Sequence, residues 1–175
     1  MTTTDPPRPG SEPADRSEFH RVRPSARTGS WAHQRNLPHI EAENATYFVT
    51  FRCVPGVVLP PDARDIVRDA LRFWDGKRAD LDVAVVMPDH VHAILRPRIA
   101  GPLSAWQHSV KSYTANQVNV LLSRSGALWQ QESFDHIIRS VEEWEEKAHY
   151  VRMNPVTRHL AASPREWPWL LDAYR

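Results

Sequence analysis

The stretch LDVAVVMPDHVHAIL, residues 81–95, contains two runs of strand-forming residues separated by the short link Met87-Pro88-Asp89. Valine, isoleucine and leucine dominate both runs, as is typical of β-strands. A link this short favours a hairpin, in which the chain returns antiparallel beside the strand that it has just left. Residues 81–86 and 90–96 are therefore predicted to form an antiparallel pair of strands.

The second strand of this hairpin carries two histidines one residue apart. Side chains alternate between the two faces of a strand, so His90 and His92 should point the same way, while Val91, Ala93 and Leu95 point into the core. One metal ion could then accept both imidazoles. Because a His-x-His pair on a strand is more often two surface or hydrogen-bonded histidines, further residues are needed to indicate a metal site.

The flanking sequence predicts the rest of the fold. Strands are indicated by β-branched and aromatic residues, and helices by apolar residues spaced three and four apart. Two helix starts have capping-box spacing, Ser104 with Gln107 and Ser140 with Glu143. The predicted elements are a strand over 45–54, a helix from Pro61 to about Gly76, the hairpin, a helix from Ser104 to about Ser123, a strand within 128–139, and a helix from Ser140 that Pro155 ends.

This order of elements is the split β-α-β pattern of a ferredoxin-like α+β fold. In that fold the sheet is antiparallel and its helices cover one face. Here the helix that starts at Ser140 is an addition to the pattern. The other face of the sheet is therefore expected to be accessible.

The composition is that of one ordinary globular domain. The chain has 175 residues, of which 41% are hydrophobic and 25% charged, and its net charge of +1 argues against a strongly basic protein that coats nucleic acid. The single cysteine, Cys53, is expected in the core and excludes a disulfide framework or a cysteine-rich zinc site. Neither an apolar signal region nor a bilayer-spanning stretch is evident, so the cytoplasm is the expected location.

The first segment of the chain differs from the rest. Residues 1–35 are rich in Pro, Ser, Thr and Arg and lack apolar periodicity, so they are predicted to form a disordered arm, with 36–175 as the folded domain. Arginines outnumber acids in this arm, which would suit contact with phosphates. A solvated tail with no role is an equally good interpretation.

The last predicted helix carries a tyrosine outside its apolar stripe. Trp144, Ala148 and Val151 form the stripe, and Tyr150 lies roughly 140° from its centre. A purely structural tyrosine would normally lie within the stripe. Tyr150 and Asn154, four residues apart, stack on one helical face, which could meet a metal held by the histidines. The pair and the helix together predict a metal and a tyrosine nucleophile.

This combination suits the cleavage of a phosphodiester. A divalent cation neutralises the nonbridging oxygens, and two imidazoles with the amide oxygen of Asn154 would fill part of its coordination sphere. Mg²⁺ or Mn²⁺ fits this use, although imidazole also suits Zn²⁺. Attack by the tyrosine hydroxyl on DNA would give a covalent phosphotyrosine and a free DNA hydroxyl, so the strand could be rejoined without ATP. The sequence identifies no general base.

Two alternatives remain at this point. Tyr113 is closer in sequence to the histidines, but it falls in a helical stripe with Trp106 and Val110, where a role in the core is the natural interpretation. A zinc hydrolase would add a third ligand, such as His136 or Asp89, to the histidine pair and would use water as nucleophile. Since this third ligand has no diagnostic spacing, the hydrolase is the weaker hypothesis.

Several motifs in a fixed order resemble one known family. They are Met87-Pro88-Asp89-His90-Val91-His92, Trp129-Gln130, Ser133-Phe134-Asp135-His136, Arg139 and Tyr150-Val151-Arg152-Met153-Asn154-Pro155-Val156. This ordered combination resembles the REP-associated tyrosine transposases, relatives of the smallest insertion-sequence transposases of the HUH class. The resemblance runs from about Tyr47 to Trp169. One departure is Leu170-Leu171 after the terminal Trp-Pro-Trp, where many relatives have Ser-Ser.

The resemblance implies a bacterial enzyme with a ferredoxin-like core that nicks and joins single-stranded DNA at hairpins formed by repeated extragenic palindromes. By position, His90 and His92 would be metal ligands, Tyr150 the nucleophile that forms a 5′-phosphotyrosine, and Asn154 a further residue that binds the ion. The expected partner is single-stranded or hairpin DNA rather than a membrane, and a monomer is favoured over a dimer. The protein would lie in the bacterial cytoplasm, with the nucleoid when on DNA.

Basic residues near the motifs are candidates for contacts with DNA phosphates. They are Lys111, Arg124, Arg139 and Arg152. Each is equally well interpreted as an ordinary exposed base. The main rival to catalysis is a relative that binds DNA hairpins and regulates loci without cutting. The intact histidine pair, tyrosine and asparagine favour catalysis, because a pure binder would need none of them.

Overall fold

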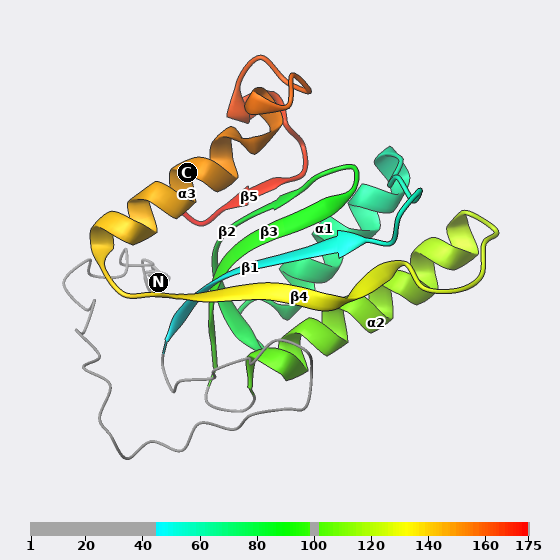
Figure 1. The fold of residues 1–175 in the computed structure, drawn as a ribbon, viewed down its shortest axis with the longest axis horizontal. Helices are drawn as coiled ribbons and strands as arrows, with labels where there is room; N and C mark the ends of the chain where they lie inside the picture. Colours follow the sequence, from blue (N-terminus) through cyan, green and yellow to red (C-terminus); the bar gives the residue numbers. More distant parts are fainter. Residues whose placement is uncertain (1–44, 99–101, 175) are drawn as a thin grey trace, which may run out of the picture.

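The computed structural model describes residues 45–98 and 102–174, so the predicted arm over 1–35 lies outside the described residues. Five strands form one antiparallel sheet in the order β4-β1-β3-β2-β5 (Figure 1). The elements are β1 (Thr46–Cys53), α1 (Pro61–Trp74), β2 (Ala79–Val86), β3 (His90–Pro97), α2 (Leu103–Leu121), β4 (Trp129–Ile138), α3 (Val141–Thr157), the 3-10 helix η2 (Pro164–Glu166) and β5 (Leu170–Asp172). The order of β1 to β4 with α1 and α2 confirms the predicted ferredoxin-like α+β fold.

Strands β2 and β3 form the predicted histidine hairpin. The N–H of Met87 donates to the carbonyl of His90 at 2.8 Å, which closes the turn. In the register that follows, Val85 pairs with His92 and Val86 with Val91. Because β3 lies between β1 and β2 in the sheet, its backbone is hydrogen bonded on both sides. The histidines therefore sit on one of the most firmly held strands of the molecule.

The two faces of the sheet carry separate hydrophobic clusters. One cluster packs the sheet against α1 and α2 and contains Val91, Ala93 and Leu95, as predicted. The other is built from the alternate strand residues, on the opposite face, and includes Ala148 and Val151 of α3. The face that was expected to be accessible is thus partly covered by the tyrosine helix, which packs on β2 and β3.

Helix α3 joins the two edges of the sheet. It follows β4, one edge strand, and the chain then returns through η2 to β5, the other edge strand (Figure 1, from yellow through orange to red). The indole N–H of Trp167 donates to the Val86 carbonyl at 3.1 Å, and that of Trp169 to Asp65 at 2.9 Å. These bonds hold the C-terminal tail against β2 and α1. Strand β5 was not predicted from the sequence, although Leu171 is buried and pairs with Ala84.

The predicted capping box at the start of α2 is wrong. The helix begins at Leu103, its N-cap is Pro102, and no side chain caps it. Ser104 therefore already lies inside the first turn, two positions after the N-cap from which a side chain accepts hydrogen bonds from the orphan N–H groups. Gln107 is buried against the sheet instead of reaching back to the helix start.

The start of α3 was predicted correctly and its end was not. The hydroxyl of Ser140 accepts a hydrogen bond from the N–H of Glu143 at 3.1 Å, as in a capping box. Pro155 does not end the helix, which continues to Thr157. A proline removes only its own N–H, and the next turn still closes because Arg158 N–H donates to the carbonyl four residues before it at 3.1 Å.

The prediction that Tyr113 belongs to the core is also wrong, because its side chain is 51% exposed. The buried stripe of α2 runs from Val110 to Thr114 and Val118, at a spacing of four, and Tyr113 lies one position off it. Thr114 is held there by the indole N–H of Trp129, which donates to its hydroxyl at 2.9 Å. Tyr113 is nevertheless distant from the histidines, because α2 packs on the opposite face of the sheet. Its position in the fold, rather than burial, argues against it as the nucleophile.

Two expectations about the chain as a whole can be compared with the structure. Cys53 is buried in the cluster between the sheet and helices α1 and α2, as expected. None of the helices within residues 45–98 and 102–174 combines the length and the apolar character that crossing a bilayer requires.

Candidate active site

The two histidines lie side by side on the face of β3 that looks toward α3. Both are almost fully buried, and their ring centroids are 4.6 Å apart. On the neighbouring strand β1, Arg52 pairs with His90 and Thr50 with His92. The ring of Phe48 stacks on that of His92, with centroids 5.5 Å apart and an interplanar angle of 19°. The site is therefore built on two adjacent central strands.

Hydrogen bonding orients the ring of His90. Its Nδ1–H donates to Oδ1 of Asp89 at 2.6 Å, because an ionised carboxylate can only accept. The lone pair is then on Nε2, which is buried and has no hydrogen-bond partner. Burial lowers the pKa of His90 below its ordinary value, against the opposing effect of Asp89. A neutral imidazole with a carboxylate behind it and a bare nitrogen in front is the usual arrangement of a metal-binding histidine.

The ring of His92 is held between a threonine and the candidate nucleophile. Its Nδ1 lies 2.7 Å from Thr50 Oγ1, and its Nε2 lies 3.4 Å from the hydroxyl oxygen of Tyr150. Burial, reinforced by the charges of His90, Arg52 and Arg158, lowers the pKa of His92 to about 3. This imidazole is therefore neutral at physiological pH, as a metal ligand must be.

Tyr150 reaches the site from α3 while staying open to solvent. Ala148 and Val151 on the same helix are buried and anchor it to the sheet, whereas the side chain of Tyr150 is 48% exposed. Its ring meets His92 edge to face at 5.1 Å and Phe48 at 6.1 Å. The hydroxyl is thus directed at the histidine pair and remains within reach of a substrate.

Asn154 lies one helical turn beyond Tyr150. It is 5% exposed, and its Oδ1 is buried without a hydrogen-bond partner. One further turn along α3 lies Arg158. Burial raises the pKa of Asp89, but the hydrogen bond from His90 and the charges of His90, Arg158 and Arg52 outweigh it, so the pKa of this carboxyl is lowered. Asn154 lies on α3 between Tyr150, which meets His92, and Arg158.

These three side chains fit a divalent cation. Nε2 of His90 and Oδ1 of Asn154 are buried atoms with unused lone pairs, and burying such atoms without a partner costs free energy that a bound ion would offset. Within the part of the chain that the structure describes, no group of three His, Cys, Asp or Glu side chains could hold a metal. Among the described residues, the two third ligands considered for the zinc hydrolase have other partners, since Asp89 holds His90 and His136 pairs with Glu143.

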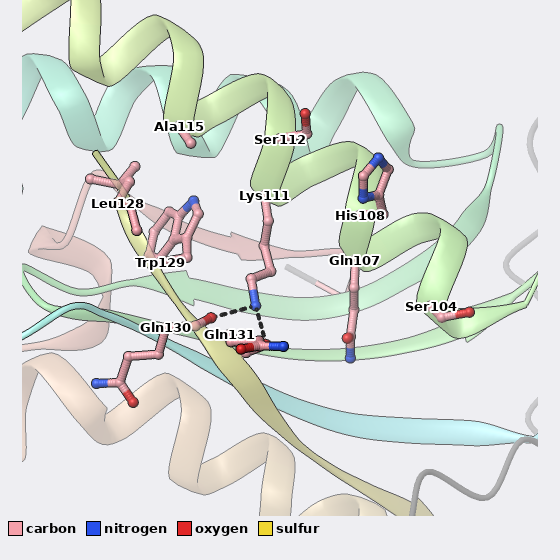
Figure 2. Close-up of a pocket in the computed structure, with 11 residues that line it drawn as sticks. Ser104, Gln107, His108, Lys111, Ser112, Ala115, Leu128, Trp129, Gln130 and Gln131 are labelled. Carbon is pink, nitrogen blue, oxygen red and sulfur yellow. Dashed lines mark hydrogen bonds between the residues drawn. The ribbon is translucent and has the colours of Figure 1, made fainter. Parts of the chain in front are cut away.

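Three of the four candidate DNA-contact residues make internal hydrogen bonds. Lys111 lies in a pocket between α2 and β4 (Figure 2). Its ammonium group donates to the carbonyls of Gln130 and Gln131 at 2.8 and 3.2 Å. That pocket is on the α2 face of the sheet, away from the histidines. Contact of Lys111 with DNA stays a prediction, as does that of the exposed Arg139.

The other two candidates are held by neighbouring parts of the chain. Arg124 donates to the side chain of Asn119 and the carbonyl of Ala127, at 2.8 and 2.9 Å. Arg152 forms a bidentate pair with Asp172 of β5 at 2.8 and 3.0 Å. The arginine thereby fastens α3 to the edge strand, which gives it a structural role whether or not it meets DNA.

Sequence reasoning missed two cations beside the histidines, Arg52 and Arg158. Arg52 follows Thr50 by two residues in β1 and therefore shares its face, and its guanidinium lies 3.9 Å from Asp89. Arg158 follows Asn154 by four residues and shares its side of α3. Both could have been found by extending the strand and helix periods already used for His90, His92, Tyr150 and Asn154.

Comparisons with known proteins support the fold. No protein-family model matches this chain, and no curated protein matches it. A solved REP-associated tyrosine transposase bound to a REP hairpin superposes with a TM-score of 0.66 and 18% identity, over 78% of this chain and 81% of that one. A putative transposase from Deinococcus radiodurans R1 gives a TM-score of 0.47 and 18% identity, over 69% and 95% of the two chains. The chain thus has the fold of a REP-associated tyrosine transposase.

Proposed function

We propose that this protein is a metal-dependent transposase-like enzyme that nicks single-stranded DNA at palindromic hairpins and transfers the strand through a 5′-phosphotyrosine. The observation that carries the proposal is the 3.4 Å approach of the Tyr150 hydroxyl to Nε2 of His92. An exposed tyrosine beside two neutral, partly unpartnered imidazoles has no evident structural purpose. The fold supports the proposal, because a protein of the same fold has been solved bound to a REP hairpin.

Nε2 of His90, Nε2 of His92 and Oδ1 of Asn154 are the atoms that would hold the ion. The set occupies three positions and leaves others open for phosphate and water, which suits Mg²⁺ or Mn²⁺ in phosphoryl transfer. When bound, such an ion supplies the positive charge that neutralises the nonbridging phosphate oxygens. Asp89 and Thr50 fix the orientation of the two rings through their contacts with the Nδ1 atoms.

Tyr150 would carry the covalent step. Its hydroxyl oxygen forms a bond to phosphorus while the bond from phosphorus to the 3′ oxygen breaks. The phenol gives up its proton to solvent, and the released 3′ oxygen takes one up. Arg52 lies 3.9 Å from Asp89, and the charge of Arg158 acts on the same carboxyl; both would draw the phosphodiester toward the tyrosine. The reverse reaction, with another 3′ hydroxyl, would transfer the strand.

Tyr150 meets His92 of its own chain, which supports a monomer as the proposed active form. Location in the bacterial cytoplasm and association with the nucleoid follow from the proposed activity and are part of the proposal.

The test is the capture of a covalent adduct. Labelled DNA hairpins with single-stranded flanks are incubated with the protein and Mg²⁺ or Mn²⁺, then denatured. Wild type and Tyr113→Phe should carry the label, whereas Tyr150→Phe should not. Tyr113 is a matched control because it is about as exposed as Tyr150, at 51% against 48%, but lies on the other face of the sheet. Hairpin binding with no adduct under any metal condition would indicate the DNA-binding regulator instead.

A further inference from the structure

One large apolar side chain on the site's side of the sheet has no structural reason to be exposed. Phe134 of β4 is 55% exposed. It pairs with Thr50 of β1, which pairs with His92 of β3, so the three form one row across the sheet and point to the same face. Since neighbouring strands are about 4.8 Å apart, the backbones at Phe134 and His92 are roughly 10 Å apart.

Phe134 belongs to an aromatic cluster that includes the candidate nucleophile. The buried ring of Phe48 stands at the centre of this cluster. It stacks on His92 and meets Tyr150 and Phe134 edge to face, with centroids 6.1 and 6.3 Å away. Phe48 thus packs against one side of the Phe134 ring, and the rest of the Phe134 ring is open to solvent. Helix α3 packs on the other half of this face, over β2 and β3.

Positive charges near the Phe134 ring are suited to the phosphate of a nucleotide. Arg52 lies beside Thr50 along β1 on the same face, with about half of its side chain exposed. Arg158 adds a second positive charge from α3 that acts on the same histidines. An open aromatic ring on the same face as Arg52, the Tyr150 hydroxyl and the charge of Arg158 offers a stacking surface for a base and an electrostatic site for its phosphate.

We propose that Phe134 is the platform on which an unpaired base stacks, next to the phosphodiester that Tyr150 attacks. This inference rests on the proposed function and deepens it. In a duplex both faces of a base are already covered by its neighbours, so only an unpaired nucleotide can use the ring. Phe134 would thereby select DNA whose attacked strand is single-stranded beside the hairpin.

The experiment compares two DNA probes in the Tyr150→Phe background, where no cleavage occurs. One probe is a hairpin with a fully paired stem and no flanks, called the paired hairpin. The other is the same hairpin with single-stranded flanks of randomised sequence. Phe134→Ala should weaken binding of the flanked hairpin by roughly 5- to 100-fold and leave that of the paired hairpin unchanged. Phe134→Tyr should retain affinity, because it keeps the ring. Phe73→Ala is the matched control, since Phe73 is 56% exposed on α1, on the other side of the sheet.

A second readout locates the contact. Flanked hairpins that carry 5-iododeoxyuridine are irradiated in complex with the protein, and the cross-linked peptide is sequenced. Cross-links at Phe134 are expected, and cross-links confined to other positions overturn the platform. An equal loss of affinity for both probes, or no loss, also overturns it. If these binding effects appear but the wild type forms no tyrosine adduct, the stacking role of Phe134 is supported and the proposed cleavage is wrong. If adducts form without these binding effects, the proposed cleavage is supported and the stacking role of Phe134 is wrong.

Discussion

The hydroxyl oxygen of Tyr150 lies 3.4 Å from Nε2 of His92, although the two residues are 58 positions apart in the chain. Two unrelated elements must be placed for this contact to exist. The central strand β3 fixes the histidine, and the packing of Ala148 and Val151 on the sheet fixes the rotation of α3. The contact therefore depends on tertiary structure, and changes near it test both the site and its support.

Adding Mn²⁺ should stabilise the folded protein. An ion that binds only the native state at 100 times its dissociation constant raises the free energy of unfolding by about 2.7 kcal/mol. Urea denaturation with and without Mn²⁺ measures the difference. The His149→Ala variant, which removes an exposed histidine next to Tyr150, should keep the full effect. An equal stabilisation of the His90→Ala variant would place the bound ion elsewhere.

Replacing Asn154 by leucine should separate stability from metal binding. Its Oδ1 is buried without a partner, so removing it costs little, and the metal-free variant should have an unfolding free energy within about 1 kcal/mol of wild type. The Mn²⁺ stabilisation should shrink or vanish, since one ligand is gone. Thermal denaturation in chelator and in Mn²⁺ gives both values. A variant that retains the whole metal effect would remove Asn154 from the ligand set.

Arg152→Ala should destabilise the fold. The partner carboxylate of Asp172 is almost fully buried, and the arginine's loss leaves that charge poorly compensated, at a cost of about 3 kcal/mol. Chemical denaturation measures this cost. DNA affinity, determined well below the unfolding midpoint, should change little if the role is structural. A large loss of affinity in a variant of normal stability would instead make Arg152 a DNA contact.

The thiol of Cys53 should be inert in the folded protein. Burial, with a smaller contribution from Asp89, raises its pKa from 9.0 to about 12. At pH 8 the reaction with a disulfide reagent should therefore occur only in unfolded molecules, and the rate should rise when urea is added. The folded state binds this proton more tightly than the unfolded state, so stability is full below pH 9 and falls as the pH rises toward 12. The Cys53→Ala variant should lack that alkaline slope.

Local periodicity predicted which side chains share a face of one strand or one helix. Alternation in β3 put His90 and His92 on one face. Helical spacing put Tyr150 and Asn154 on one side of α3, where Tyr150 is half exposed and Asn154 is buried. The order of strands and helices was enough to predict the ferredoxin-like sheet. Nearly every contact that orients the catalytic candidates, apart from the hydrogen bond of His90 to Asp89, joins residues distant in sequence, such as Thr50 with His92.

What the sequence did not predict has a common physical cause. Whether a basic side chain is free depends on acceptors elsewhere in the chain, and the pattern around Lys111 or Arg152 contains no sign of the β4 carbonyls or of Asp172. Likewise, nothing in the sequence of α3 states that it crosses to the face opposite α1 and α2. The burial of Tyr113 was predicted wrongly because its neighbour Thr114, whose side chain has both a methyl and a hydroxyl group, takes the buried position.

The span of α3 from one edge strand to the other limits what the nucleophile can do. Its N-terminal end continues from β4, and its C-terminal end leads into β5 through Trp167 and Trp169, which donate hydrogen bonds to β2 and α1. Exchange of this helix with a second molecule would require an edge strand to unpair first. If the protein is the strand transferase proposed here, Tyr150 keeps its position throughout the reaction. The departing and the incoming DNA ends must then occupy the site one after the other.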